Sequence, residues 1–193
     1  MCGFRNALIV LCVALLAGGC STVYSTHPVG DTPRNIETEK EAWAGTWYWQ
    51  GENERAWLHV QVADAARGVL RMAWIEYEEN APMMRAADLF LRDAGGWTIA
   101  SMRMVDKPEQ TRYFWALINR KGRVITLWAP VVERFCALVR AGKLPGTVGP
   151  GALPGDCGDV TLPQLDANHL ELITSETHGL LFDWKSPGML IRQ

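Results

Sequence analysis

An alternation of apolar and polar residues within the stretch from Trp57 to Ala63 is the clearest pattern in the chain. Leu58, Val60 and Val62 face one way, while the two residues between them are polar. This two-residue period predicts a half-buried β-strand. Similar stretches recur up to residue 128 and are separated by turn motifs such as Asp-Ala-Gly-Gly and Arg-Lys-Gly. The other strands that we predict are Gly45 to Gln50, Val69 to Tyr77, Asp88 to Arg92, Trp97 to Val105, Thr111 to Ile118 and Arg123 to Trp128.

Beyond residue 130 the period of the apolar residues becomes that of a helix. Apolar residues from Val132 to Val139 lie at i, i+3, i+4 and i+7, with Pro130 before them and Gly142 after them. This spacing predicts a helix over residues 131–142. A second helix is favoured over residues 165–174, although the second half of that stretch also fits a strand.

The order of these elements predicts the fold class. Successive strands joined by turns this short form an antiparallel meander, and its two edges would leave backbone groups unpaired. Closing the sheet on itself removes both edges. We therefore expect a mainly β protein with one or two helices, built as a small antiparallel meander or barrel. Residues 43–193 form its single domain, and a C-terminal extension contains extended segments at 180–184 and 189–192.

The N-terminal part of the chain has a different composition. An apolar run of eleven residues, Ala7–Ala17, follows Arg5. It is far shorter than the roughly twenty residues of a membrane-spanning helix, so residues 1–19 are predicted to be a removable signal peptide. The next stretch is polar, holds two prolines and lacks periodicity. It predicts a flexible tether over residues 20–42.

The end of the apolar run carries a recognisable motif. Leu16-Ala17-Gly18-Gly19-Cys20 resembles the lipobox of bacterial lipoproteins. The resemblance implies that a peptidase cuts before Cys20, that the new N-terminus is acylated and that the Cys20 sulfur carries a diacylglycerol. The alternative is an ordinary secretory signal with Cys20 at the cleavage site by chance. Several acyl chains hold a protein to a bilayer stably. Ser21, in place of Asp, implies the periplasmic face of the outer membrane, and the mature chain looks like the uncharacterised small lipoproteins of Gram-negative bacteria.

Charge and cysteine content narrow the partners. The net charge is −2 and becomes −3 without Arg5, which argues against a nucleic-acid partner because phosphates require a basic face. Cys136 and Cys157 are the two cysteines left when the signal peptide and the lipid-bearing Cys20 are set aside. An even pair in an oxidising compartment predicts a disulfide across the Gly/Pro-rich segment between them. Two separately buried thiols are the alternative.

The start of the predicted domain is similar to a known family of barrels. Gly45-Thr46-Trp47 resembles the Gly-x-Trp opening of lipocalins, in which the tryptophan plugs the closed end of the barrel. The order of strand, Trp128-Ala129-Pro130 and helix resembles the last barrel strand and following helix of that family. These likenesses imply a lipocalin-like barrel that could hold a hydrophobic or amphipathic small molecule.

Nine tryptophans are available to line or to fill such a barrel. Trp47, Trp57, Trp74 and Trp115 lie on predicted strands and are the candidate lining residues for an apolar or sugar-like ligand. The alternative, which we favour, is that they fill the interior, because side chains can just occupy an eight-stranded barrel. The four methionines within residues 83–104 are likewise expected in the core.

The sequence does not predict a reaction. The glutamates from Glu76 to Glu79 are typical of a solvated strand end. Ser175, His178 and Asp183 are the residue types of a nucleophile triad, but they lack the Gly-x-Ser-x-Gly elbow. The histidine and cysteine spacings fit no common metal motif. We therefore expect a protein that is not an enzyme and that uses no cofactor or metal.

Two functions remain. The first is a non-catalytic interaction or envelope-accessory module, with the Gly/Pro-rich segment between Cys136 and Cys157 as the loop that contacts a partner protein. The alternative is a lipocalin-like binder of a hydrophobic or amphipathic small molecule. The volume of the barrel interior separates them, because a binding cavity needs at least about 300 Å³.

Overall fold

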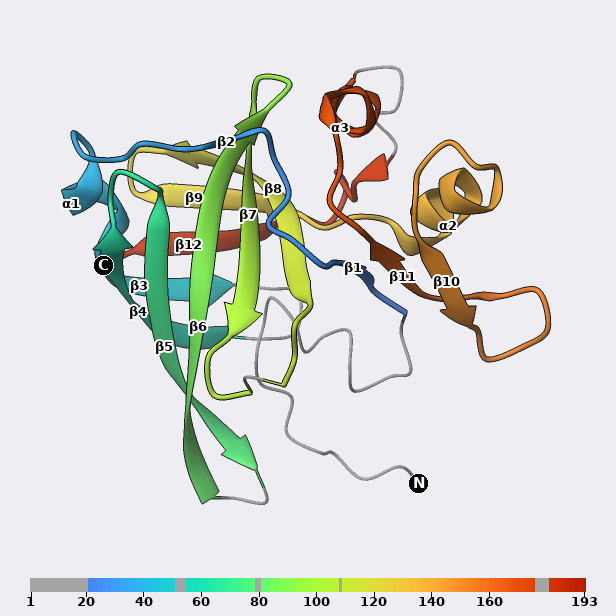
Figure 1. The fold of residues 1–193 in the computed structure, drawn as a ribbon. Coiled ribbons are helices and arrows are strands. Elements are labelled where there is room, and N and C mark those ends of the chain that lie inside the picture. The colour runs from blue at the N-terminus through green and yellow to red at the C-terminus, as the bar shows by residue number, and fades with distance from the viewer. Residues whose placement is uncertain (1–20, 51–54, 79–80, 108, 176–180) are drawn as a thin grey trace.

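One sheet organises the described part of the molecule. The computed structural model describes residues 21–193 except 51–54, 79–80, 108 and 176–180. Within these residues a twelve-stranded sheet closes on itself into an eight-stranded antiparallel barrel with extra strands at its side (Figure 1). The predicted fold class, mainly β with a small antiparallel barrel, is confirmed.

The barrel strands follow the hydrophobic pattern. The eight strands are β3 (Gly45–Gln50), β4 (Arg55–Asp64), β5 (Val69–Glu78), β6 (Ala81–Ala94), β7 (Trp97–Met104), β8 (Tyr113–Lys121), β9 (Val124–Trp128) and β12 (Gly188–Arg192). In β4 the residues Ala56, Leu58 and Val60 are buried and alternate with exposed neighbours, as the two-residue period predicts. The β8–β9 turn is made by Gly122, whose φ of +60° lies in the left-handed region.

Strand β12 closes the barrel. It pairs antiparallel with β9 on one side and with β3 on the other, with Leu190 opposite Ile125 and Trp49. The sequence predicts an extended segment here but not its place in the sheet. Residues 188–192 of the C-terminal extension are therefore part of the barrel wall, whereas the other predicted extended segment, in its described residues 181–184, forms only an isolated bridge between Phe182 and Pro130.

The prediction of a flexible tether is wrong for residues 21–42. Strand β1 (Val23–Ser25) is buried and pairs with the first half of β8, while β9 pairs with the second half of the same strand. The chain then crosses one end of the barrel, where β2 (Thr32–Pro33) pairs with β6 and Ile36 is fully buried. The short helix α1 (Lys40–Trp43) follows (Figure 1). We call residues 26–43 the strap. The barrel buries the few apolar residues of the strap, and this burial outweighs the polar character of the surrounding sequence.

A lobe beside the barrel is built from the remaining elements. It consists of β1, α2 (Val132–Arg140), β10 (Thr147–Pro150), β11 (Cys157–Leu162) and α3 (Ala167–Thr174). Helix α2 confirms the predicted helix over 131–142, and α3 confirms the helix favoured over 165–174. The Gly/Pro-rich segment folds into the β10–β11 hairpin, and β11 pairs in parallel with β1. The predicted disulfide between Cys136 and Cys157 is present and fastens this hairpin to α2.

Candidate functional site

The barrel interior is filled by side chains. A pocket among these side chains measures only about 30 Å³ and is bordered by apolar residues that include Trp43, Trp47, Met72 and Leu127. Trp47 is almost completely buried, and its Nε1–H donates to the Trp43 carbonyl oxygen at 3.0 Å. A pocket of this size holds about one water molecule and no drug-sized ligand. The favoured interpretation, that tryptophans fill the barrel, agrees with this volume.

The four tryptophans predicted to line a ligand site do not come together. Trp47 and Trp74 belong to the barrel core. Trp115 points out of the barrel into the core of the lobe, where its ring lies 5.5 Å from that of Phe135. Trp57 is exposed on the outer surface. Successive residues of a strand face opposite sides of the sheet. Ala56 is buried, so Trp57, the next residue, points outward.

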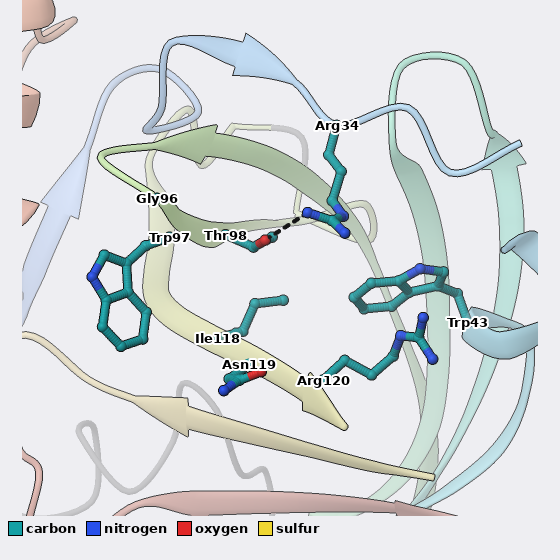
Figure 2. A pocket seen from close by; sticks show the side chains of 8 residues that line it. All are labelled: Arg34, Trp43, Gly96, Trp97, Thr98, Ile118, Asn119 and Arg120. Atoms are coloured by element: carbon teal, nitrogen blue, oxygen red, sulfur yellow. Dashed lines mark hydrogen bonds between the residues drawn. The ribbon is translucent and has the colours of Figure 1, made fainter. Parts of the chain in front are cut away.

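A separate cavity lies over the rim of the barrel, under the strap. Its volume is about 360 Å³. The strap supplies Arg34 and, from α1, Trp43. The start of β7 supplies Trp97, and the end of β8 supplies Asn119 and Arg120. Figure 2 shows the Trp43 and Trp97 side chains on opposite sides of this cavity. We call it the rim cavity.

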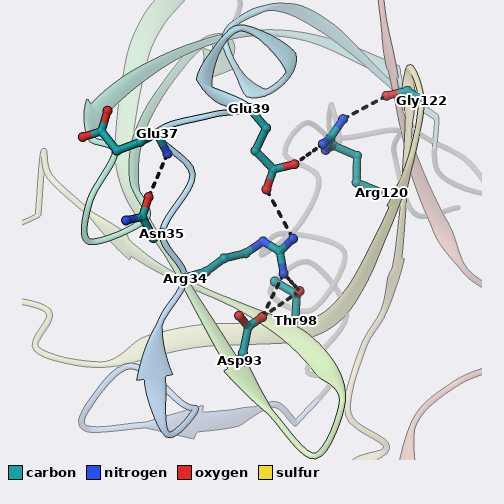
Figure 3. Close-up of polar contacts among 8 residues, drawn as sticks. All are labelled: Arg34, Asn35, Glu37, Glu39, Asp93, Thr98, Arg120 and Gly122. Carbon is teal, nitrogen blue, oxygen red and sulfur yellow. Dashed lines mark hydrogen bonds and ion pairs between the residues drawn. The ribbon is translucent and has the colours of Figure 1, made fainter.

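Both charged residues that line the rim cavity are held by carboxylates. Arg34 Nη1 donates to Asp93 Oδ1 at 3.1 Å, and Arg34 Nη2 donates to Glu39 Oε1 at 3.2 Å. Glu39 Oε2 accepts from Arg120 Nη2, so one carboxylate bridges both guanidinium groups (Figure 3). Thr98 Oγ1 accepts from Arg34 at 3.0 Å. The network joins the strap to β6, β7 and β8 and thereby fixes the strap over the barrel end.

The pKa values of this network show that its charges stabilise one another. Burial is the largest single influence on Arg34 and opposes its charge, but Asp93 and Glu39 together more than offset it, and the pKa of Arg34 lies above its ordinary value. Burial likewise works to raise the pKa of Glu39. Its contacts with Arg120 and Arg34 outweigh that influence and hold the pKa below its ordinary value.

Aromatic rings extend from the rim cavity toward the lobe. The Trp97 ring lies 5.9 Å from that of Trp128 and 5.5 Å from that of Trp184, and the Trp128 and Trp184 rings are 4.9 Å apart. On the other side of the cavity the Arg120 guanidinium lies over the Trp43 ring, 5.0 Å from its centre. The rings of Trp128 and Trp184 therefore hold the Trp97 ring in place.

A second surface feature is an apolar area on the outside of the barrel. It comprises Tyr48, Trp57, Ile75, Tyr77 and Met84, and we call it the outer hairpin face. The exposed fractions of Trp57, Ile75 and Met84 are 58%, 55% and 77%. Tyr48 packs against Trp57 with ring centres 5.0 Å apart, and Ile75 pairs with Met84 across β5 and β6. These two strands extend beyond the barrel as a long hairpin (Figure 1).

Register makes this face continuous. Leu58 of β4 pairs with Trp74 of β5, and both are buried. Because the two strands are antiparallel, Trp57, one residue before Leu58, and Ile75, one residue after Trp74, lie opposite each other on the outer side. The expectation that the methionines lie in the core is correct for Met102, which is buried, and for Met104, which packs half-buried against the core, and it is wrong for the exposed Met83 and Met84.

The remaining sequence candidates are placed as follows. Glu76 accepts from Arg85 Nε at 2.7 Å and is a structural ion-pair partner. Cys20, Glu79 and His178 lie outside the described residues, so the structure places neither the lipid attachment site nor a Ser175–His178–Asp183 arrangement. Among the residues that are described, three or more His, Cys, Asp or Glu side chains nowhere gather in a way that could hold a metal ion. The helices in the described ranges are all too short or too polar to cross a membrane.

Sequence reasoning missed the residues of the rim cavity. Arg34 lies in the segment predicted to be a tether, and Arg120 lies in the Arg-Lys-Gly stretch, which is interpreted only as a turn. Trp43 was the one available signal, since a tryptophan directly before the first strand suggests that the chain packs there. The strap, β7 and β8 meet at this cavity through contacts between residues that are far apart in the sequence.

Comparison with known proteins adds no assignment. No family model matches the chain, and no curated protein or solved structure matches it at a significant level.

Proposed function

We propose that this protein is a membrane-anchored envelope lipoprotein that acts as a non-catalytic interaction module. In this proposal, lipid on Cys20 holds the chain to the periplasmic face of the outer membrane. The outer hairpin face binds a partner protein there. Neither nucleic acid nor a cofactor takes part.

The observation that carries the proposal is the exposure of the outer hairpin face. Large apolar side chains that gather on a surface mark sites of interaction more often than scattered ones do. Trp57 and Tyr77 belong to residue types that are enriched where proteins bind one another. Both are about half exposed or more, and they lie on the outer side of paired strands. Exposed Arg55, two residues before Trp57, favours a partner with carboxylates around its apolar contact area.

The filled interior supports an interaction module over the alternative, a lipocalin-like binder. About 30 Å³ of free space is roughly a tenth of the smallest usual ligand pocket. A binder of fatty acids or similar molecules would have to displace Trp47 or its neighbours from the core. The outer hairpin face is available for binding without such a rearrangement.

The position of the contact is tested by photo-crosslinking in intact bacteria that produce the full-length protein. A photoreactive residue is placed at Met84 or Trp57. The matched control carries it at Leu153, which is 67% exposed at the tip of the β10–β11 hairpin. We expect a defined crosslinked protein from positions 84 and 57, and loss of that product when Ile75→Glu is added. Equal products from position 153, or adducts with lipid alone, would contradict the proposal.

The anchor is tested separately. In the Cys20→Ser variant the protein should move from the membrane fraction to the soluble fraction, because the acyl chains supply the membrane affinity. Mass spectrometry of the detergent-extracted protein should show that the chain begins at a lipid-modified Cys20. An intact leader or an unmodified sulfur would remove the anchor from the proposal. The outer hairpin face would then be judged by the crosslinking experiment alone.

A further inference from the structure

The interaction module does not use the rim cavity. The cavity lies at the strap-covered end of the barrel, and its residues are distinct from those of the outer hairpin face. At about 360 Å³ it falls in the lower part of the range of small-molecule sites. Its lining is mixed: two arginines, two tryptophans, an asparagine and a threonine stand around the apolar Ile118. Such a lining favours a small, polar ligand.

The charges at the cavity wall favour an anion. Arg34 and Arg120 are the charged residues of the described chain that line it. Glu39 and Asp93 contact the guanidinium groups but do not line the cavity. The arginines are therefore held in position by carboxylates that do not line the cavity, and the charged groups that a ligand meets at the wall are guanidinium groups. A planar guanidinium pair held in this way is suited to a carboxylate.

Both arginines retain donors for a ligand. A guanidinium has five N–H groups, and the contacts with Asp93, Thr98 and Glu39 use three of those of Arg34. Arg120 donates to Glu39 and to the Gly122 carbonyl oxygen. The Nε–H groups of both arginines are buried and closed to a ligand in the cavity, so the donors left for a ligand are one Nη N–H group of Arg34 and two of Arg120. A carboxylate that accepts from these Nη groups would stabilise this end of the barrel, because hydrogen bonds between charged groups are stronger than those between neutral ones.

The uncharged lining favours a hydroxylated ring. Trp97 is held by Trp128 and Trp184, so its ring is a fixed surface against which a flat ligand can pack. Asn119 is exposed beside it and offers an amide that can donate to and accept from hydroxyl groups.

We propose that the rim cavity binds a small sugar acid. Its carboxylate accepts from the Nη N–H groups of Arg34 and Arg120 that Glu39 and Asp93 leave unused, its ring packs against Trp97, and a ring hydroxyl bonds to the Asn119 amide. The site belongs to the same chain as the outer hairpin face but acts independently of it.

The test is a titration of the full-length protein in detergent with glucuronate, followed by calorimetry and by the indole N–H signals in NMR. Glucose lacks the carboxylate, and cyclohexanecarboxylate lacks the hydroxyl groups. We expect glucuronate to bind and to shift the Trp97 indole signal. We expect both analogues to bind at least about tenfold more weakly, the loss typical of removing hydrogen bonds at a charged or polar site.

Variants locate the binding. Arg120→Gln should weaken glucuronate at least tenfold, and Asn119→Ala, at an exposed position, should weaken it without affecting folding. The matched control is Arg123→Gln, which removes a nearby exposed arginine that does not line the cavity. The proposal is overturned if glucuronate fails to bind at 10 mM, if cyclohexanecarboxylate binds as tightly, or if Arg123→Gln weakens binding as much as Arg120→Gln.

Discussion

Removing the Cys136–Cys157 disulfide tests how firmly the lobe is held together. The bridge joins residues 21 positions apart in the chain and connects α2 to the first residue of β11. In the unfolded chain a crosslink of this span restricts conformational freedom, and the loop-closure relation gives about 3 kcal/mol of stabilisation. Strand β11 also pairs with β1, so loosening the hairpin affects the segment that leads into the strap.

The assay is urea unfolding followed by circular dichroism. We expect the reduced protein, and the Cys136→Ala/Cys157→Ala variant, to lose about 3 kcal/mol in the free energy of unfolding. This loss lowers the urea midpoint by more than about 1 M. Reduction keeps both sulfur atoms, and thus isolates the crosslink from the loss of side-chain packing around the fully buried Cys136.

The double variant treated with reductant is the control and should not change further. A loss below about 1 kcal/mol on reduction would refute the loop-closure reasoning. Such a result would mean that the lobe retains its compactness in the unfolded state or draws its stability from packing alone.

Four further predictions concern the ion network, the core of the lobe and two turns. The pKa of Glu39 is lower in the folded protein than its ordinary value of 4.5. Its contribution to the free energy of unfolding is therefore present above that pH and is lost as the pH falls through the folded value. On acidification, the Glu39→Gln variant should lose less free energy of unfolding than the unchanged protein. Phe135→Ala should cost about 3–5 kcal/mol in urea unfolding, because the ring is fully buried between Trp115 and Phe182, and a cost below 1 kcal/mol would show that the lobe collapses around the gap. Gly122→Ala should cost about 1–2 kcal/mol through its positive φ alone, since the added carbon meets open space. Gly95→Ala should lower the melting temperature further, because there the carbon would clash with a threonine of α3, and equal melting temperatures would contradict the clash.

The sequence was sufficient for the elements whose burial is set locally. The alternation around Leu58 places β4 correctly, and the helical spacing around Phe135 places α2. The same alternation also indicates that Trp57 points outward, so its choice as an interior residue contradicts the strand period. Trp115 could not be placed in this way, because β8 is buried on both faces and shows no alternation.

The parts that could not be predicted depend on distant contacts. Val23 and Ile36 lie within a polar stretch, and only the barrel and the lobe bury them. The rim cavity needs Arg34 of the strap beside Arg120 at the end of β8, and no local pattern links these residues. The Gly/Pro-rich segment after α2 is interpreted as a loop, yet it pairs as β10 and β11 because the disulfide and β1 hold it.

The position of β12 sets the order in which the protein can be completed. The strand between β3 and β9 is the last of the eight in the chain, so every earlier stage of synthesis leaves those two strands with open edges. Until residues 188–192 are delivered, unpaired backbone and the interior tryptophans face the solvent, a state prone to aggregation. The emerging polypeptide therefore needs protection until its final strand arrives, and its folding is expected to be slow for its size because the closing contacts join the two ends of the barrel sequence.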